Sequence, residues 1–155
     1  MIINLNLSNG KQDRFVDYYS SGSKSIVSKN FCDFINELNV DGIQFLEGTE
    51  GNVIKDLKLD YYYIHIFKRI SCVDRNNSIL DINEETNRIR SIKKFSIDSE
   101  VLKHISIEER LMFFLDESVH IKLFHETIVR QIISSGMKGF KFVKVSEWGE
   151  GSAFD

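Results

Sequence analysis

The chain lacks several features that would define a location or a cofactor. It has no proline, two cysteines and one tryptophan among its 155 residues. Cys32 and Cys72 show neither a Cys-x-x-Cys spacing nor a zinc-binding pattern. The N-terminal stretch does not resemble a secretory leader, and no apolar run approaches the roughly 20 residues of a membrane-spanning helix. We therefore expect a cytoplasmic protein with reduced thiols and no membrane contact.

An excess of basic residues is also missing. Lys and Arg total 20 against 23 Asp and Glu, which gives a net charge of −3, and the cations are scattered along the chain. Nucleic-acid binders normally gather cations on one face, so that class is disfavoured. The 42% hydrophobic content suits a single domain over residues 1–155, because a chain of this length buries roughly 70% of its unfolded surface.

Helical periodicity is present in two regions. In residues 28–38, Ser28 is a suitable N-cap, and one face is apolar: Phe31, Phe34, Ile35 and Leu38. Asn39 and Gly42 tolerate the left-handed backbone with which a helix ends, and a strand follows. A second helix is predicted over residues 125–135, with an apolar stripe of Ile128, Val129, Ile132 and Ile133.

The strongest strand signal is the aromatic and β-branched stretch at residues 60–74. Alternation places one set of side chains on the first face: Tyr62, Ile64, Ile66 and Ile70. The opposite face carries Tyr61, Tyr63, His65 and Phe67. Because both faces are largely apolar, we predict a central strand with a covering layer on each side.

Further strands are predicted around a turn at residues 84–87 and in the apolar stretches after residue 110. Between them, residues 99–111 should form a short helix or loop that directs three apolar side chains inward: Val101, Leu102 and Ile105. Together these elements predict an α+β domain. Its mainly antiparallel sheet carries two packed helices, at about residues 28–38 and 125–135.

An offset of 97 residues relates the two helical regions. It aligns "GIQF" at 42–45 with "GFKF" at 139–142, and it aligns the apolar positions of the two helices. Each segment therefore consists of a helix, a glycine turn and a strand. Two explanations remain open: a pair of equivalent units around the central sheet, or convergence of common helix–turn–strand motifs on one pattern.

Motifs for catalysis are missing, because the chain has neither a glycine-rich phosphate loop nor a zinc-protease signature. An enzyme would have to combine His120 or His125 with a neighbouring carboxylate, from Asp116, Glu117 or Glu126. A strand position and a helix start explain the same histidines without catalysis. We therefore predict no enzymatic activity, metal or cofactor, with a small hydrolase as the alternative.

Acidic residues cluster in two segments. Residues 33–60 contain seven acids against two lysines, and the segment 146–155, expected to be a flexible tail, contains three acids and no base. Such runs are usually solvated surface, but they also attract basic protein partners. An aromatic residue in the tail suits an interface anchor. The candidate partner-binding residues are Glu47, Glu50, Asp56, Glu147, Trp148 and Glu150.

The order of these segments resembles immunity proteins of bacterial polymorphic-toxin systems, and above all immunity family eleven. The resemblance covers residues 24–145. In chain order, the matching positions are Val27, Ser28, Tyr61 to Tyr63, Asp74, Ser78, the strand before Asp98, Gly136, Gly139 and Phe142.

The resemblance implies a cytoplasmic, cofactor-free toxin inhibitor that acts through protein–protein interaction. Such a protein binds a cognate toxin domain stoichiometrically and blocks its active site or another essential surface. Neither nucleic acid nor membrane is an expected partner. A regulatory or scaffold module with a non-toxin partner is a further alternative beside the hydrolase.

Overall fold

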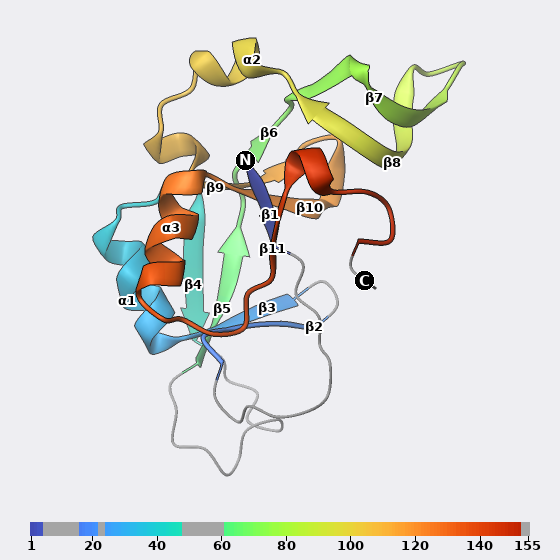
Figure 1. The fold of residues 1–155 in the computed structure, drawn as a ribbon. Helices are drawn as coiled ribbons and strands as arrows, with labels where there is room; N and C mark the ends of the chain where they lie inside the picture. Colours follow the sequence, from blue (N-terminus) through green and yellow to red (C-terminus); the bar gives the residue numbers. More distant parts are fainter. Residues whose placement is uncertain (5–15, 22–23, 48–60, 153–155) are drawn as a thin grey trace.

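The computed structural model describes residues 1–4, 16–21, 24–47 and 61–152 (Figure 1). Its helices are α1 (Lys29–Glu37), α2 (Ser99–Lys103) and α3 (Glu126–Ser134), with short 3-10 turns η1 (Glu108–Arg110) and η2 (Val145–Glu147). Its strands are β1 (Ile2–Asn4), β2 (Tyr18–Ser21), β3 (Lys24–Ser28), β4 (Ile43–Glu47), β5 (Tyr61–Ile66), β6 (Arg69–Ile70), β7 (Val73–Asn83), β8 (Arg88–Ile97), β9 (Met112–Leu115), β10 (Ser118–Phe124) and β11 (Phe142–Lys144). The predicted α+β class with mainly antiparallel pairing is confirmed.

The strands divide among three sheets, where the sequence indicated one. The first has the order β2-β3-β5-β4 and is antiparallel throughout. The second has the order β11-β1-β10-β9-β6, and only its β6–β9 pair is parallel. The third is the hairpin β7–β8, which turns at residues 84–87 as predicted and projects at the upper right of Figure 1.

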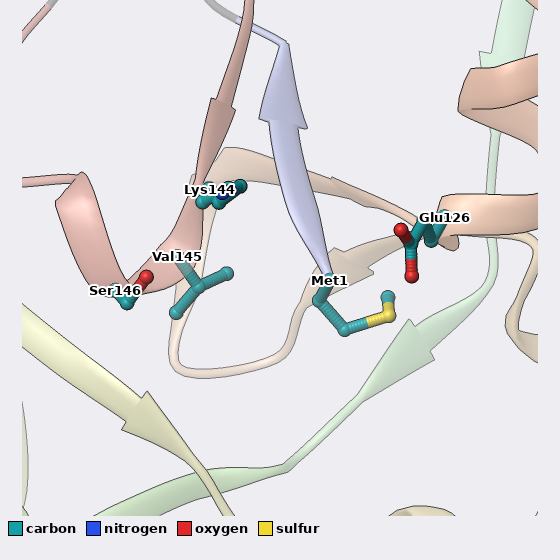
Figure 2. A pocket seen from close by; sticks show the side chains of 5 residues that line it. All are labelled: Met1, Glu126, Lys144, Val145 and Ser146. Carbon is teal, nitrogen blue, oxygen red and sulfur yellow. The ribbon is translucent and has the colours of Figure 1, made fainter.

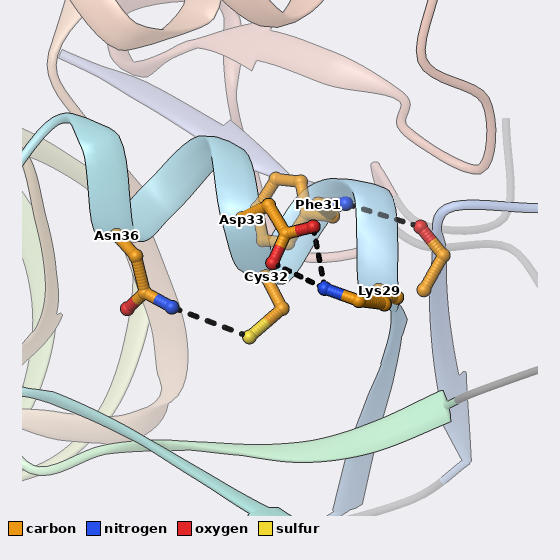
Figure 3. Close-up of polar contacts among 6 residues, drawn as sticks. Lys29, Phe31, Cys32, Asp33 and Asn36 are labelled. Atoms are coloured by element: carbon orange, nitrogen blue, oxygen red, sulfur yellow. Dashed lines mark hydrogen bonds and ion pairs between the residues drawn. The ribbon is translucent and has the colours of Figure 1, made fainter.

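Helix α1 begins and ends where the sequence indicates. Ser28 is the N-cap, and its Oγ accepts a 3.1 Å hydrogen bond from the backbone N–H of Phe31 (Figure 3). The apolar face packs inward, with Phe31, Cys32 and Ile35 buried. Beyond the helix, Asn39 and Gly42 adopt φ angles of 49° and 75°, which confirms the predicted left-handed exit.

The offset of 97 residues extends through a whole structural unit. In the first unit, hairpin β2–β3 leads into α1, a glycine turn and β4, and β5 pairs between β3 and β4. In the second, hairpin β9–β10 leads into α3, a glycine turn and β11, and β1 pairs between β10 and β11. Both ends of α3 lie 97 residues after those of α1. The two units therefore have the same topology.

The strand registers of the two units also match. Four residues align across the first sheet in the order Tyr19, Ile26, Tyr63 and Leu46. Across the second sheet the same row consists of Phe113, Leu123, Ile3 and Val143. Two of these pairs again differ by 97, namely Ile26 with Leu123 and Leu46 with Val143. Convergence on a helix–turn–strand motif does not require a shared four-strand register, so the structure favours equivalent units.

The inner faces of the two sheets meet in one core with the apolar sides of α1 and α3. Both sheets contribute side chains that are almost wholly buried: Tyr18, Val27, Met112 and Phe124. A polar link crosses the same junction, where Lys122 Nζ donates to Ser25 Oγ at 2.6 Å and to the hydroxyl of Tyr18 at 2.9 Å. Lys122 lies 97 residues after Ser25, so this link joins equivalent positions of the two units.

A second core covers the opposite face of the five-stranded sheet. Phe113 and Leu123 from that sheet are fully buried in it. The hairpin β7–β8 contributes Ile92 and Phe95, and α2 contributes Leu102 as predicted. The hairpin therefore serves as the covering layer of the second unit, because its apolar side lies on the sheet.

Two predictions about apolar stretches are wrong. The single strand predicted over residues 60–74 is divided among β5, β6 and β7, which belong to three different sheets. The N–H groups of Phe67 and Lys68 both donate to the carbonyl of Gly42, at 2.9 and 3.3 Å, and this contact ends β5. Ile133, predicted to be buried, is 64% exposed. The stripe of α3 that meets the core consists of Ile128, Val129 and Ile132.

Candidate partner-binding surface

The face of the four-stranded sheet that points away from the shared core is rich in apolar side chains. We call it the outer face, and its described side chains are Tyr19, Ile26, Ser28, Gln44, Leu46, Tyr61, Tyr63, His65 and Phe67. Tyr19 is 42%, Leu46 46% and Phe67 57% exposed. Within the part of the chain that the structure describes, no helix or strand forms the predicted covering layer over these positions. By contrast, Ile64 and Ile66 on the inner face are buried as predicted.

The described side chains of the outer face combine aromatic rings with very little charge. The rings of His65 and Phe67 lie 6.1 Å apart between centroids. The hydroxyl of Tyr61 donates to the carbonyl of Val16 at 3.1 Å, and burial raises the pKa of this phenol. Among the described side chains of this face, His65 is the one ionisable group other than the tyrosines. Exposed apolar patches with a polar border are typical of protein-binding surfaces.

Acidic groups lie at the two ends of β4, and the pairing of Glu47 with Tyr62 places this terminal residue on the inner-face side of the strand. Glu47 ends the strand, is exposed and has no ion pair within the described part of the chain. Before the strand, Asp41 shares the ammonium of Lys68 with Glu109, at 3.2 and 2.9 Å. The hydrogen bond from Lys68 lowers the pKa of the Glu109 carboxyl, and the same bond raises the pKa of Lys68. At one end of β4 two carboxylates thus share a single ammonium, whereas Glu47 at the other end has no such ion pair within the described residues.

The predicted partner-binding residues fall in separate places. Glu50 and Asp56 lie outside the described residues, and Glu47 is the last residue of β4. The segment that holds the other three crosses β8, where the N–H of Glu150 donates to the carbonyl of Lys93 at 2.8 Å. In that segment the ring of Trp148 packs edge-on against Phe95, with centroids 5.3 Å apart. The two acids beside it, Glu147 and Glu150, are exposed.

The histidines of the hydrolase alternative have different environments. His125 is the N-cap of α3, and its Nδ1 accepts from the N–H of Thr127 at 3.2 Å. Desolvation, followed by the nearby charge of Arg110, lowers the pKa of His125. His120 is exposed on β10. Neither ring has a hydrogen bond to a carboxylate within the residues described, so the arrangement needed for general acid–base catalysis is not assembled there.

A hollow of about 300 Å³ lies beside the start of α3 (Figure 2). Its lining comes from Met1, Glu126, Lys144, Val145 and Ser146. The charged groups of this lining pair with neighbours on their own segments, since Glu126 binds Arg130 at 2.7 Å and Lys144 lies 3.7 Å from Glu147. Ligand pockets usually have a few polar groups that converge on the ligand. The charged groups of this hollow do not converge in that way, because each pairs with a neighbour on its own segment.

Two further site classes are unsupported in the part that the structure describes. No group of three or more His, Cys, Asp or Glu residues there is arranged to hold a metal ion. No helix there is long and apolar enough to cross a membrane. Both cysteines are free and buried, and burial raises the pKa of the Cys72 thiol to about 12, which makes it a poor nucleophile.

Two positions that carried the family resemblance have a structural role. Asp74 Oδ1 accepts from the N–H groups of Asn76 and Asn77, at 2.9 and 3.3 Å, and so builds a bulge near the start of β7. Ser78 donates its hydroxyl proton to the carbonyl of Asp74 and accepts from the N–H of Ser96 at 3.0 Å. The pair therefore shapes the hairpin that covers the second unit.

The comparisons with known proteins identify the family of this chain. No curated protein matches the chain. The family model described as the immunity protein family (Imm11) matches residues 5–147. This match spans the first unit, the hairpin β7–β8 and the second unit except for strand β1. Because it covers most of the 155 residues, the chain belongs to the immunity protein family Imm11.

Proposed function

We propose that this protein neutralises a cognate bacterial toxin domain by binding it stoichiometrically in the cytoplasm. The observation that carries the proposal is the family match over residues 5–147. The exposed apolar outer face supports it, because a stoichiometric inhibitor needs a surface from which water is excluded when the complex forms. Steric blocking of the toxin requires no catalytic group in the inhibitor.

The acidic candidates are proposed as contacts that steer association. Glu47 is exposed at the end of β4, and Glu50 and Asp56 follow it in the sequence. Exposed charges of one sign raise the association rate with an oppositely charged partner and give it a marked salt dependence. Glu147 and Glu150 form a second acidic group beside β8, and Trp148 contributes by holding that segment against Phe95.

Co-expression with the product of the adjacent upstream gene tests the function. The proposal expects that product to arrest growth alone, and growth to recover when this protein is present. Reversing Glu47, Glu50 and Asp56 to lysine should weaken rescue, whereas reversing Glu84 and Glu85 in the hairpin turn is the matched control. Growth arrest that this protein leaves unchanged would remove the basis of the proposal.

A further inference from the structure

The two equivalent units differ in what covers them. In the second unit, the row that contains Phe113 and Leu123 lies beneath hairpin β7–β8 and α2, and both side chains are fully buried. In the first unit, the matching row contains Tyr19 and Leu46, which are both exposed. Among the described residues, the same sheet architecture therefore has a covering layer on one unit and exposed apolar side chains on the other.

The chain itself shows what kind of element fits such a face. Hairpin β7–β8 lays an apolar side on the five-stranded sheet, with Ile92 and Phe95 buried. Charged side chains of both signs remain exposed on it: Arg75, Asp81, Glu84, Glu85, Arg88, Arg90, Lys93 and Lys94. The hairpin is thus an amphipathic β-element with an aliphatic and aromatic side and a charged border.

We propose that the outer face of the first unit docks a comparable element of the toxin: an amphipathic segment whose apolar side covers Tyr19, Leu46 and Phe67. This inference rests on the proposed function and specifies the surface and the chemistry of the partner. The toxin segment completes in trans the layer that hairpin β7–β8 provides in cis for the second unit.

The acidic residues at the two ends of β4 indicate which charge the partner segment carries. Within the described chain, Glu47 is exposed at the end of β4 without an ion pair, and Asp41 adds a shared carboxylate at the other end. A complementary segment therefore carries Lys or Arg beside its apolar side, which places opposite charges together when the face is buried.

Alanine variants of exposed residues test the surface without removing core side chains. Leu46→Ala and Phe67→Ala truncate the outer face. Val119→Ala and Ile133→Ala are matched controls, because these residues are 50% and 64% exposed on β10 and α3. The affinity of each purified variant is measured by titration with a catalytically inactivated form of the adjacent-gene toxin, after its unfolding midpoint has been compared with wild type.

Each outer-face variant should bind at least about tenfold more weakly than wild type, and each control should stay within about twofold. Glu47→Gln should slow association mainly at low salt. A wild-type complex whose affinity is unchanged by Leu46→Ala and Phe67→Ala would overturn the docking surface but leave the proposed function intact. No complex with wild type would overturn both.

Self-association provides a separate check. Sedimentation of the protein alone should give a monomer, because the outer face is assigned to the toxin. A dimer that Leu46→Ala dissociates would show that a second copy covers this face, and would overturn the inference.

Discussion

Replacing Gly139 by alanine should destabilise the protein much more than the same change at Gly136. Both glycines have positive φ angles, 95° and 71°, so either alanine costs about 1–2 kcal/mol in the left-handed region. At Gly139 the added Cβ would also lie 2.2 Å from the carbonyl oxygen of Tyr18, whereas at Gly136 it would meet nothing within 4 Å. The Tyr18 backbone cannot easily withdraw, because its N–H bonds to the carbonyl of Lys138.

Gly42, which is equivalent to Gly139, should behave in the same way. Its φ is 75°, and an added Cβ would lie 2.3 Å from the Cβ of Lys68. Relief requires movement of the Lys68 backbone, whose N–H bonds to the carbonyl of Gly42. Overpacking of this kind costs about 1–3 kcal/mol in addition to the backbone term. We therefore expect total losses of about 2–5 kcal/mol at Gly42 and Gly139.

Thermal unfolding monitored by circular dichroism measures the difference between these variants. A loss of 1 kcal/mol lowers Tm by roughly 2–4 °C for a protein of this size. Gly136→Ala should therefore lower Tm by about 2–8 °C, and Gly42→Ala and Gly139→Ala by about 4–20 °C. Equal shifts for all three variants would refute the claim that close packing at the two equivalent turns adds to the cost of positive φ.

Three further predictions concern the caps and the thiols. Ser28→Ala should lower the free energy of unfolding by about 1 kcal/mol in denaturant titrations, because the Phe31 N–H loses its acceptor; no change would mean that the cap is dispensable. The pKa of His125 is lowered in the fold, so the unfolded chain binds more protons below pH 6.5, and stability should fall as pH is lowered through that value. His125→Asn keeps a capping oxygen and should flatten this dependence, while an unchanged pH profile would contradict the assignment. Cys72, with its buried thiol and a pKa of about 12, should react with a thiol reagent at pH 8 only as fast as the protein opens, so rapid labelling under native conditions would contradict its burial.

Local features of the fold were predictable because they depend on neighbouring residues. The helix cap at Ser28, the turn at residues 84–87 and the glycine exit at Gly42 follow from short patterns. The even-odd alternation also placed Tyr61 and His65 on the face opposite Ile64 correctly. What alternation could not supply was whether another element covers that face.

Long-range pairing explains the remaining differences. The strand predicted at residues 60–74 is divided because the N–H groups of Phe67 and Lys68, which follow β5, donate to the carbonyl of Gly42 in a distant part of the sequence. The insertion of β1 between β10 and β11 joins the two ends of the chain, and no short pattern indicates it. Trp148 is of a residue type that often anchors interfaces, but in this fold its ring packs against Phe95 of the same chain. For the candidate site, the cluster of acidic residues near Glu47 was visible in the sequence. The exposed apolar face could be recognised only once the pairing of the strands was known.

Calorimetric titration of the purified protein with an inactivated form of the adjacent upstream gene's product tests the central claim most directly. The account predicts a complex with a stoichiometry of one to one and a negative heat-capacity change, because apolar surface is buried when the outer face is covered. A toxin that arrests growth but produces no binding heat and no complex with this protein would contradict the account.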